Sequence, residues 1–131
     1  MRLIVAMCAL AVLACGSASA PLKELQRAKA GRLNVVLLSS NDSLKRGTSN
    51  FTVEFRDDAG NLVDAGTVNV NATMPMAGMA PMIGDCNVTP ASTKGRYDVA
   101  TSLGMAGTWR LQISWNGAAG QGSVSMPGSV L

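Results

Sequence analysis

Short runs in which apolar and polar residues alternate are the feature that most constrains the fold of this chain. Apolar residues stand at every second position in Phe51–Phe55, Val68–Ala72 and Trp109–Trp115. A period of two puts successive side chains on opposite faces of an extended backbone, so each run predicts a β-strand with one buried face. Turn-forming residues separate the runs, as at Asp57–Asn61 and Asn116-Gly117. The chain is therefore predicted to be built from strands joined by tight turns.

The runs recur at a spacing of roughly ten residues, which is typical of an all-β sandwich. About seven short strands are expected, an estimate based on that spacing. They cover residues 33–38, 51–55, 67–73, 85–89, 97–103, 109–115 and 120–126. The predicted fold class is all-β, an antiparallel β-sandwich of immunoglobulin-like type.

The first residues have the features of a signal peptide. Met1-Arg2 is a short basic start, and Leu3–Ala14 is an unbroken apolar run. That run of about a dozen residues is too short to cross a hydrocarbon core of roughly 30 Å. The expected organisation is a signal peptide at residues 1–14, a linker at 15–31 and one β-sandwich domain at 32–131.

The residues around Cys15 suggest how the signal is processed. Val12-Leu13-Ala14-Cys15 resembles a bacterial lipobox, although Leu13 stands where a small residue is usual. Lipidation of Cys15 would make the protein a membrane-anchored lipoprotein, secreted across the inner membrane to the periplasmic face. A freely secreted protein, cut near Ala18-Ser19-Ala20, is the alternative left open.

The segment Met74–Met82 is the main candidate for a functional site. Its nine residues include four methionines and two prolines, and the whole chain has no histidine. Thioether sulfur is soft and needs no deprotonation, which suits Cu(I), or Ag(I) as its surrogate, better than Zn(II) or Mg(II). Gly78 permits a tight reversal that would let the sulfurs converge. The candidate metal ligands are Met74, Met76, Met79, Met82, Met105 and Cys86.

Packing is the alternative explanation for the same residues. Met74 and Met76 continue the inward alternation of the preceding strand, so they could fill one end of the sandwich. Met105, between two strands, could equally close the core. Cys86 is the one cysteine in the predicted domain, and single cysteines are usually buried and inert. The phase of Trp109 within its strand predicts a core position.

Other classes of function have little support in the sequence. The net charge is +3, and no basic stripe with interleaved aromatic residues is present, so nucleic-acid binding is not expected. The chain lacks histidine for acid–base chemistry and contains no G-x-S-x-G nucleophile motif. We therefore expect a protein that is not an enzyme.

The order of four motifs resembles the YtkA-like domain family over roughly Leu33 to Met126. The motifs are Asp58–Asp64, Met74–Met79, Lys94–Tyr97 and Leu103–Trp109. The resemblance implies an immunoglobulin-like β-sandwich. It also matches four methionines to the family's methionine positions, and Met82 and Cys86 are less clearly part of the pattern. The four are Met74, Met76, Met79 and Met105.

Related domains, including FixH-type proteins, occur in envelope proteins tied to copper handling and oxidase assembly. The resemblance thus favours a periplasmic domain that binds Cu(I) through the methionine segment and delivers or sequesters it. The second hypothesis is a metal-free interaction module whose methionines contact a metal-efflux or oxidase-assembly protein.

Overall fold

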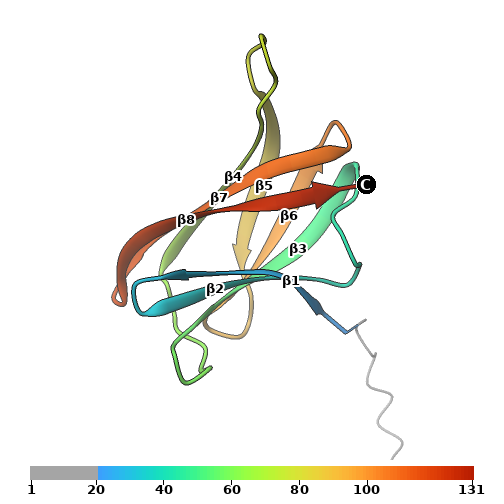
Figure 1. Cartoon of the computed structure of the whole chain (residues 1–131). Helices are drawn as coiled ribbons and strands as arrows, with labels where there is room; N and C mark the ends of the chain where they lie inside the picture. The colour runs from blue at the N-terminus through green and yellow to red at the C-terminus, as the bar shows by residue number, and fades with distance from the viewer. Residues whose placement is uncertain (1–20) are drawn as a thin grey trace, which may run out of the picture.

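The computed structural model describes residues 21–131, so the predicted signal peptide, Cys15 and the first part of the linker lie outside the described residues. The described chain forms eight antiparallel strands (Figure 1). They are β1 (Lys23–Ala30), β2 (Leu33–Ser39), β3 (Gly47–Arg56), β4 (Thr67–Met74), β5 (Met82–Pro90), β6 (Arg96–Leu103), β7 (Gly107–Gly117) and β8 (Gly120–Val130). No helix within residues 21–131 has the length and apolar character needed to cross a membrane.

Strand β5 joins the two halves of the sandwich. The strands are hydrogen-bonded in the order β1-β2-β3-β6-β5-β4-β7-β8. The first residues of β5, Met82–Gly84, pair with β4, whereas Asp85–Pro90 pair with β6. One sheet therefore contains β1, β2, β3, β6 and β5, and the other contains β5, β4, β7 and β8.

The core lies between these sheets and is built from the predicted alternating positions. The apolar residues of Phe51–Phe55, Val68–Ala72 and Trp109–Trp115 are all buried in one cluster. Phe55 meets Trp115 edge-on, with ring centroids 5.2 Å apart. The prediction of an all-β, immunoglobulin-like sandwich is confirmed, with eight strands where about seven were expected. Residues 21–131 hold the whole described core and so form a domain with a core of its own.

The additional strand is β1, which occupies residues that the sequence assigned to the linker. Its pairing with β2 shifts register between Glu24 and Gln26, so Leu25 forms a bulge. The bulge breaks the period of two, and the inward residues beyond it, Ala28 and Ala30, are small. The strand consequently lacks the apolar alternation that identified the others. Residues 23–30, which the prediction placed in the linker, therefore belong to the sheet.

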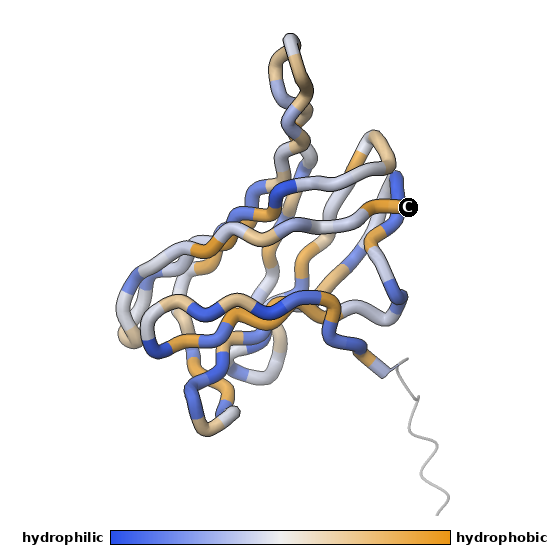
Figure 2. Tube along the Cα trace, viewed as in Figure 1, coloured by the Kyte–Doolittle hydropathy of each residue, from blue (hydrophilic) through white to orange (hydrophobic). Residues whose placement is uncertain are grey.

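Strand β5 also differs from its prediction, which was a short edge strand at residues 85–89. It starts at Met82, three residues earlier, and lies between β6 and β4 in the hydrogen-bonded order. Its added residues extend the β4–β5 hairpin, which projects from one end of the sandwich (Figure 1). The projecting part has none of the deeply hydrophilic colour seen along the body's outer strands (Figure 2). The projecting part of the hairpin therefore extends from the sandwich without a charged side chain.

Candidate metal centre

The β4–β5 hairpin puts two of the predicted ligands opposite each other. Its last three pairs are Ala72 with Gly84, Thr73 with Ile83, and Met74 with Met82. Directly opposed residues point to the same face of the sheet. Met74 and Met82 share the inward face with Ala72, and both are half-buried against the core cluster. The pairing ends there because Pro75 and Pro81 have no N–H group with which to continue the ladder.

The tip of the hairpin is a tight turn over Met76–Met79. The Met79 N–H donates to the Met76 carbonyl oxygen at 3.3 Å, and Gly78 has a φ of 72°. A positive φ at the third position is typical of a type II turn, and glycine adopts it without strain. Met76 is half-buried and Met79 is 68% exposed. The alternation does not extend to Met76 as predicted, because the strand stops before Pro75. The tip methionines therefore lie beyond the Met74–Met82 pair, on a turn of their own.

The turn between β6 and β7 lies beneath the hairpin's inward face. A Cβ atom at Gly107 would collide with Cε of Met74, so the absence of a side chain there makes room for that thioether. A Cβ atom at Gly104 would lie 3.7 Å from Sδ of Met82. Gly104 and Gly107 bracket Met105 in the sequence. The structure thus brings the Met74 and Met82 side chains against the turn that carries Met105.

Trp109 fixes this turn in place. Its indole is fully buried, as the sequence predicted, and its Nε1–H donates to the Met105 carbonyl oxygen at 2.9 Å. The bond ties the turn's backbone to the core while leaving the Met105 side chain 40% exposed. Trp109 therefore positions the backbone of a candidate ligand from beneath.

Cys86 is set apart from the methionines. It is on the inward face of β5, four residues beyond Met82, which corresponds to about 13 Å along a strand. Its Sγ lies 3.5 Å from Oγ1 of Thr101, and that hydroxyl donates its proton to the Asp85 carbonyl oxygen at 2.9 Å. The thiol is consequently the donor in its contact with Thr101. The structure does not bring this sulfur to the Met74–Met82 pair.

The hairpin itself carries no charged side chain. No residue from Ala65 to Gly84 carries a charged side chain. Across residues 21–131, no three His, Cys, Asp or Glu side chains form a group that could hold a metal ion. The side-chain sulfur atoms in the hairpin are the thioethers of Met74, Met76, Met79 and Met82.

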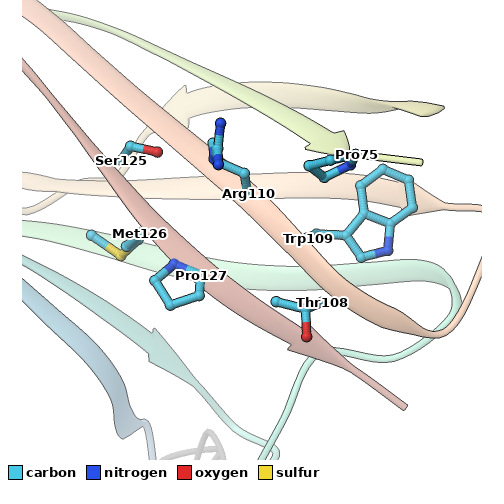
Figure 3. Close-up of a pocket in the computed structure, with 7 residues that line it drawn as sticks. All are labelled: Pro75, Thr108, Trp109, Arg110, Ser125, Met126 and Pro127. Carbon is cyan, nitrogen blue, oxygen red and sulfur yellow. The ribbon is translucent and has the colours of Figure 1, made fainter. Parts of the chain in front are cut away.

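A separate hollow of about 460 Å³ lies at the base of the hairpin (Figure 3). Pro75 lies next to the Trp109 indole at its edge, and Arg110 and Thr108 reach it from the outward face of β7. Met74 and Met82 do not line this hollow. The hairpin and the tryptophan that holds the Met105 turn therefore line the same hollow.

Sequence reasoning missed the roles of Gly104, Gly107 and Trp109. The closeness of the two glycines to the hairpin depends on β6 and β7 belonging to different sheets, which a local sequence pattern does not specify. The signal available in the sequence was the segment Leu103–Trp109, which combines two turn glycines, a methionine and a tryptophan.

A family model described as YtkA-like matches residues 27–114. The chain belongs to the YtkA-like family. The match contains β2 to β6 and most of β7, together with the methionine hairpin and the Met105 turn. The suggested resemblance is therefore confirmed for the part of the chain that carries the candidate site.

Other comparisons add little to the identification of this YtkA-like domain. No curated protein matches it significantly. The Lin-41 filamin domain is similar over 68% of this chain and 81% of its own length, with 16% identity and a TM-score of 0.49. Domains 4 and 5 of the S-layer protein SbsC are similar over 85% of this chain and 54% of theirs, with 19% identity and a TM-score of 0.41.

Proposed function

We propose that this YtkA-like domain binds Cu(I) through thioethers at the base of its methionine hairpin and delivers or sequesters the ion in the bacterial envelope. The observation that carries the proposal is the convergence on one turn: Met74 packs at Gly107 and Met82 at Gly104. Met105 lies between these glycines. Three thioethers from a paired hairpin and an adjacent turn would form a small, neutral and soft donor set.

The tip methionines have a different role in this proposal. Met79 is 68% exposed, against 40% for Met105, and it lies on a turn beyond the Met74–Met82 pair. An exposed donor can enter and leave the coordination shell without disturbing the core. Met76 and Met79 would therefore capture or release the ion, while Met74, Met82 and Met105 hold it. Cys86 is outside this ligand set.

Titration of residues 21–131 with Cu(I) against a chelating probe tests the proposal. We expect binding of one ion with an affinity that changes little from about pH 5 to about pH 8, because thioethers do not titrate and the chain has no histidine. Ag(I) should compete, and Zn(II) should not. Absence of Cu(I) binding, or equally tight binding of Zn(II), would contradict the proposal.

The proposed location is the periplasmic face of the inner membrane, with a lipid attached at Cys15. Mass spectrometry of the mature protein tests this part separately. A diacylglyceryl-modified Cys15 at the N-terminus is expected, and an unmodified chain beginning at Ser19 would contradict it.

The second candidate function is a non-enzymatic interaction module without a metal of its own, acting with a metal-efflux or oxidase-assembly protein. Exposure of Met79 and Ile83, at 68% and 77%, favours it, because the hairpin offers an adaptable apolar surface. The Cu(I) titration separates the two functions, since the module would not bind the ion.

A further inference from the structure

The sheet that contains β4, β7 and β8 has an outward face that is almost without charge. The outward positions of these three strands, which we call the neutral face, carry serine, threonine, asparagine and glutamine apart from Pro127 and a single charged residue, Arg110. Roughly a quarter to a third of the side chains on a protein surface are usually charged. The other sheet does carry charges on its outward face, where Glu54 pairs with Arg56 and Arg96. The lack of charge is therefore a property of one sheet and not of the whole domain.

Strand pairing arranges the side chains of the neutral face in rows that run across the three strands. One row is Thr67, Asn116 and Gln121, and the next is Asn69, Ser114 and Ser123. Opposed residues point to the same side of a sheet, and neighbouring strands lie about 4.8 Å apart. Each row therefore presents three neutral hydrogen-bonding groups at regular intervals.

These two rows line a hollow of about 580 Å³ on the neutral face. Within residues 21–131, none of their side chains forms a hydrogen bond with another protein group. Ser114 is half-buried and the others are exposed. Amide and hydroxyl side chains both donate and accept hydrogen bonds. The hollow thus offers free donors and acceptors, and a ligand that covers it does not have to desolvate a charge.

A chain of neutral sugar units has the chemistry that matches this hollow. Its hydroxyl groups donate and accept hydrogen bonds, and it carries no charge. In an extended β-1,4-linked glycan, the sugar units repeat at a distance close to the spacing between neighbouring strands. An apolar ligand would instead leave the covered amides without partners. An acidic ligand would find one counter-charge on the face, at Arg110, which does not line the hollow.

We propose that the neutral face binds an extended chain of neutral sugar units, laid across β4, β7 and β8 with one unit over each strand. The side chains of the two rows exchange hydrogen bonds to water for hydrogen bonds to sugar hydroxyls. Each exchange gains little, and the face has no aromatic ring on which a sugar could stack. Binding is consequently weak, with a Kd of about 0.1–1 mM. It requires no metal, so its test is independent of the proposed Cu(I) site.

Calorimetric titration of metal-free residues 21–131 with cellotetraose, an extended β-1,4-linked glucose chain, tests the proposal. We expect binding in that range, unchanged by added salt because no charges are paired. Maltotetraose has the same composition but a coiled chain, and it should bind about tenfold more weakly. Absence of cellotetraose binding at about 5 mM, or equal affinity for the two sugars, would overturn the proposal.

A pair of asparagine variants locates the binding surface. Asn69→Ala combined with Asn116→Ala removes one amide from each row, and cellotetraose affinity should fall about tenfold. The matched control is Asn50→Ala combined with Asn87→Ala, at exposed asparagines on the outward face of the other sheet. The control should bind as the wild type does. An unchanged affinity in the first variant, or an equal loss in both, would refute binding at the neutral face.

Nuclear magnetic resonance gives a second readout that does not depend on a substitution. The side-chain amide signals of Asn69, Asn116 and Gln121 should shift on addition of cellotetraose, while those of Asn50 and Asn87 stay in place. If the same three signals shift with protein concentration in the absence of sugar, a second copy of the chain covers the face and the proposal is wrong.

Discussion

Replacing Met74 and Met82 together with leucine is expected to weaken Cu(I) binding by about a hundredfold, a change of about 2.7 kcal/mol. Leucine fills nearly the same volume but has no sulfur, so the hairpin should keep its shape while losing two donors. Competition titration with a Cu(I) probe measures the change, and circular dichroism checks that the sheet is intact.

Met126→Leu is the matched control for this double substitution. Met126 is buried in the core, on β8, and it is not a candidate ligand. The control removes one thioether from the same domain, and its Cu(I) affinity should equal that of the wild type. If Met126→Leu and the double variant bind Cu(I) as tightly as the wild type, the Met74–Met82 pair is not the site.

Trp109→Ala is expected to have the largest effect on stability. Removing a fully buried aromatic side chain costs about 3–5 kcal/mol, and the Met105 carbonyl oxygen also loses its donor. For a domain of this size the thermal midpoint should fall by more than about 12 °C. Differential scanning calorimetry measures the shift. Thr108→Ala, at an exposed neighbour on the outward face, should leave the midpoint nearly unchanged.

Trp109→Phe separates the tryptophan's packing from its hydrogen bond. Phenylalanine keeps most of the apolar volume but has no N–H group to donate to Met105. We expect a smaller loss of stability, about 1–2 kcal/mol, together with weaker Cu(I) binding because the turn is no longer fixed. Unchanged Cu(I) affinity in a folded Trp109→Phe variant would mean that the turn's position does not matter to the site.

The sequence predicted the parts of the fold in which apolar burial follows a simple period. Alternation in Phe51–Phe55 and Trp109–Trp115 identified both the strands and their inward faces, because each position contributes a large apolar side chain to the core. Strand β1 was not predicted, because its bulge shifts the alternation of apolar and polar residues. The first residues of β5 were not predicted, because the inward position among them is Gly84, which has no side chain to mark it as apolar.

The candidate site was predictable in composition but not in arrangement. Gly78 and the flanking prolines indicated a reversal, and the structure has a turn there. Opposition of Met74 and Met82 depends on the number of residues in the loop, which composition does not specify. The approach of the Met105 turn depends on how β6 crosses to β7 between the sheets. Such contacts between distant segments leave no periodic signal in either one.

X-ray absorption at the copper edge of the Cu(I)-loaded domain tests the central claim most directly. Thioether binding predicts a first coordination shell made of sulfur atoms alone, and fewer sulfur neighbours in the Met74/Met82 double variant. A shell dominated by nitrogen or oxygen, or one identical in the wild type and the double variant, would contradict this account.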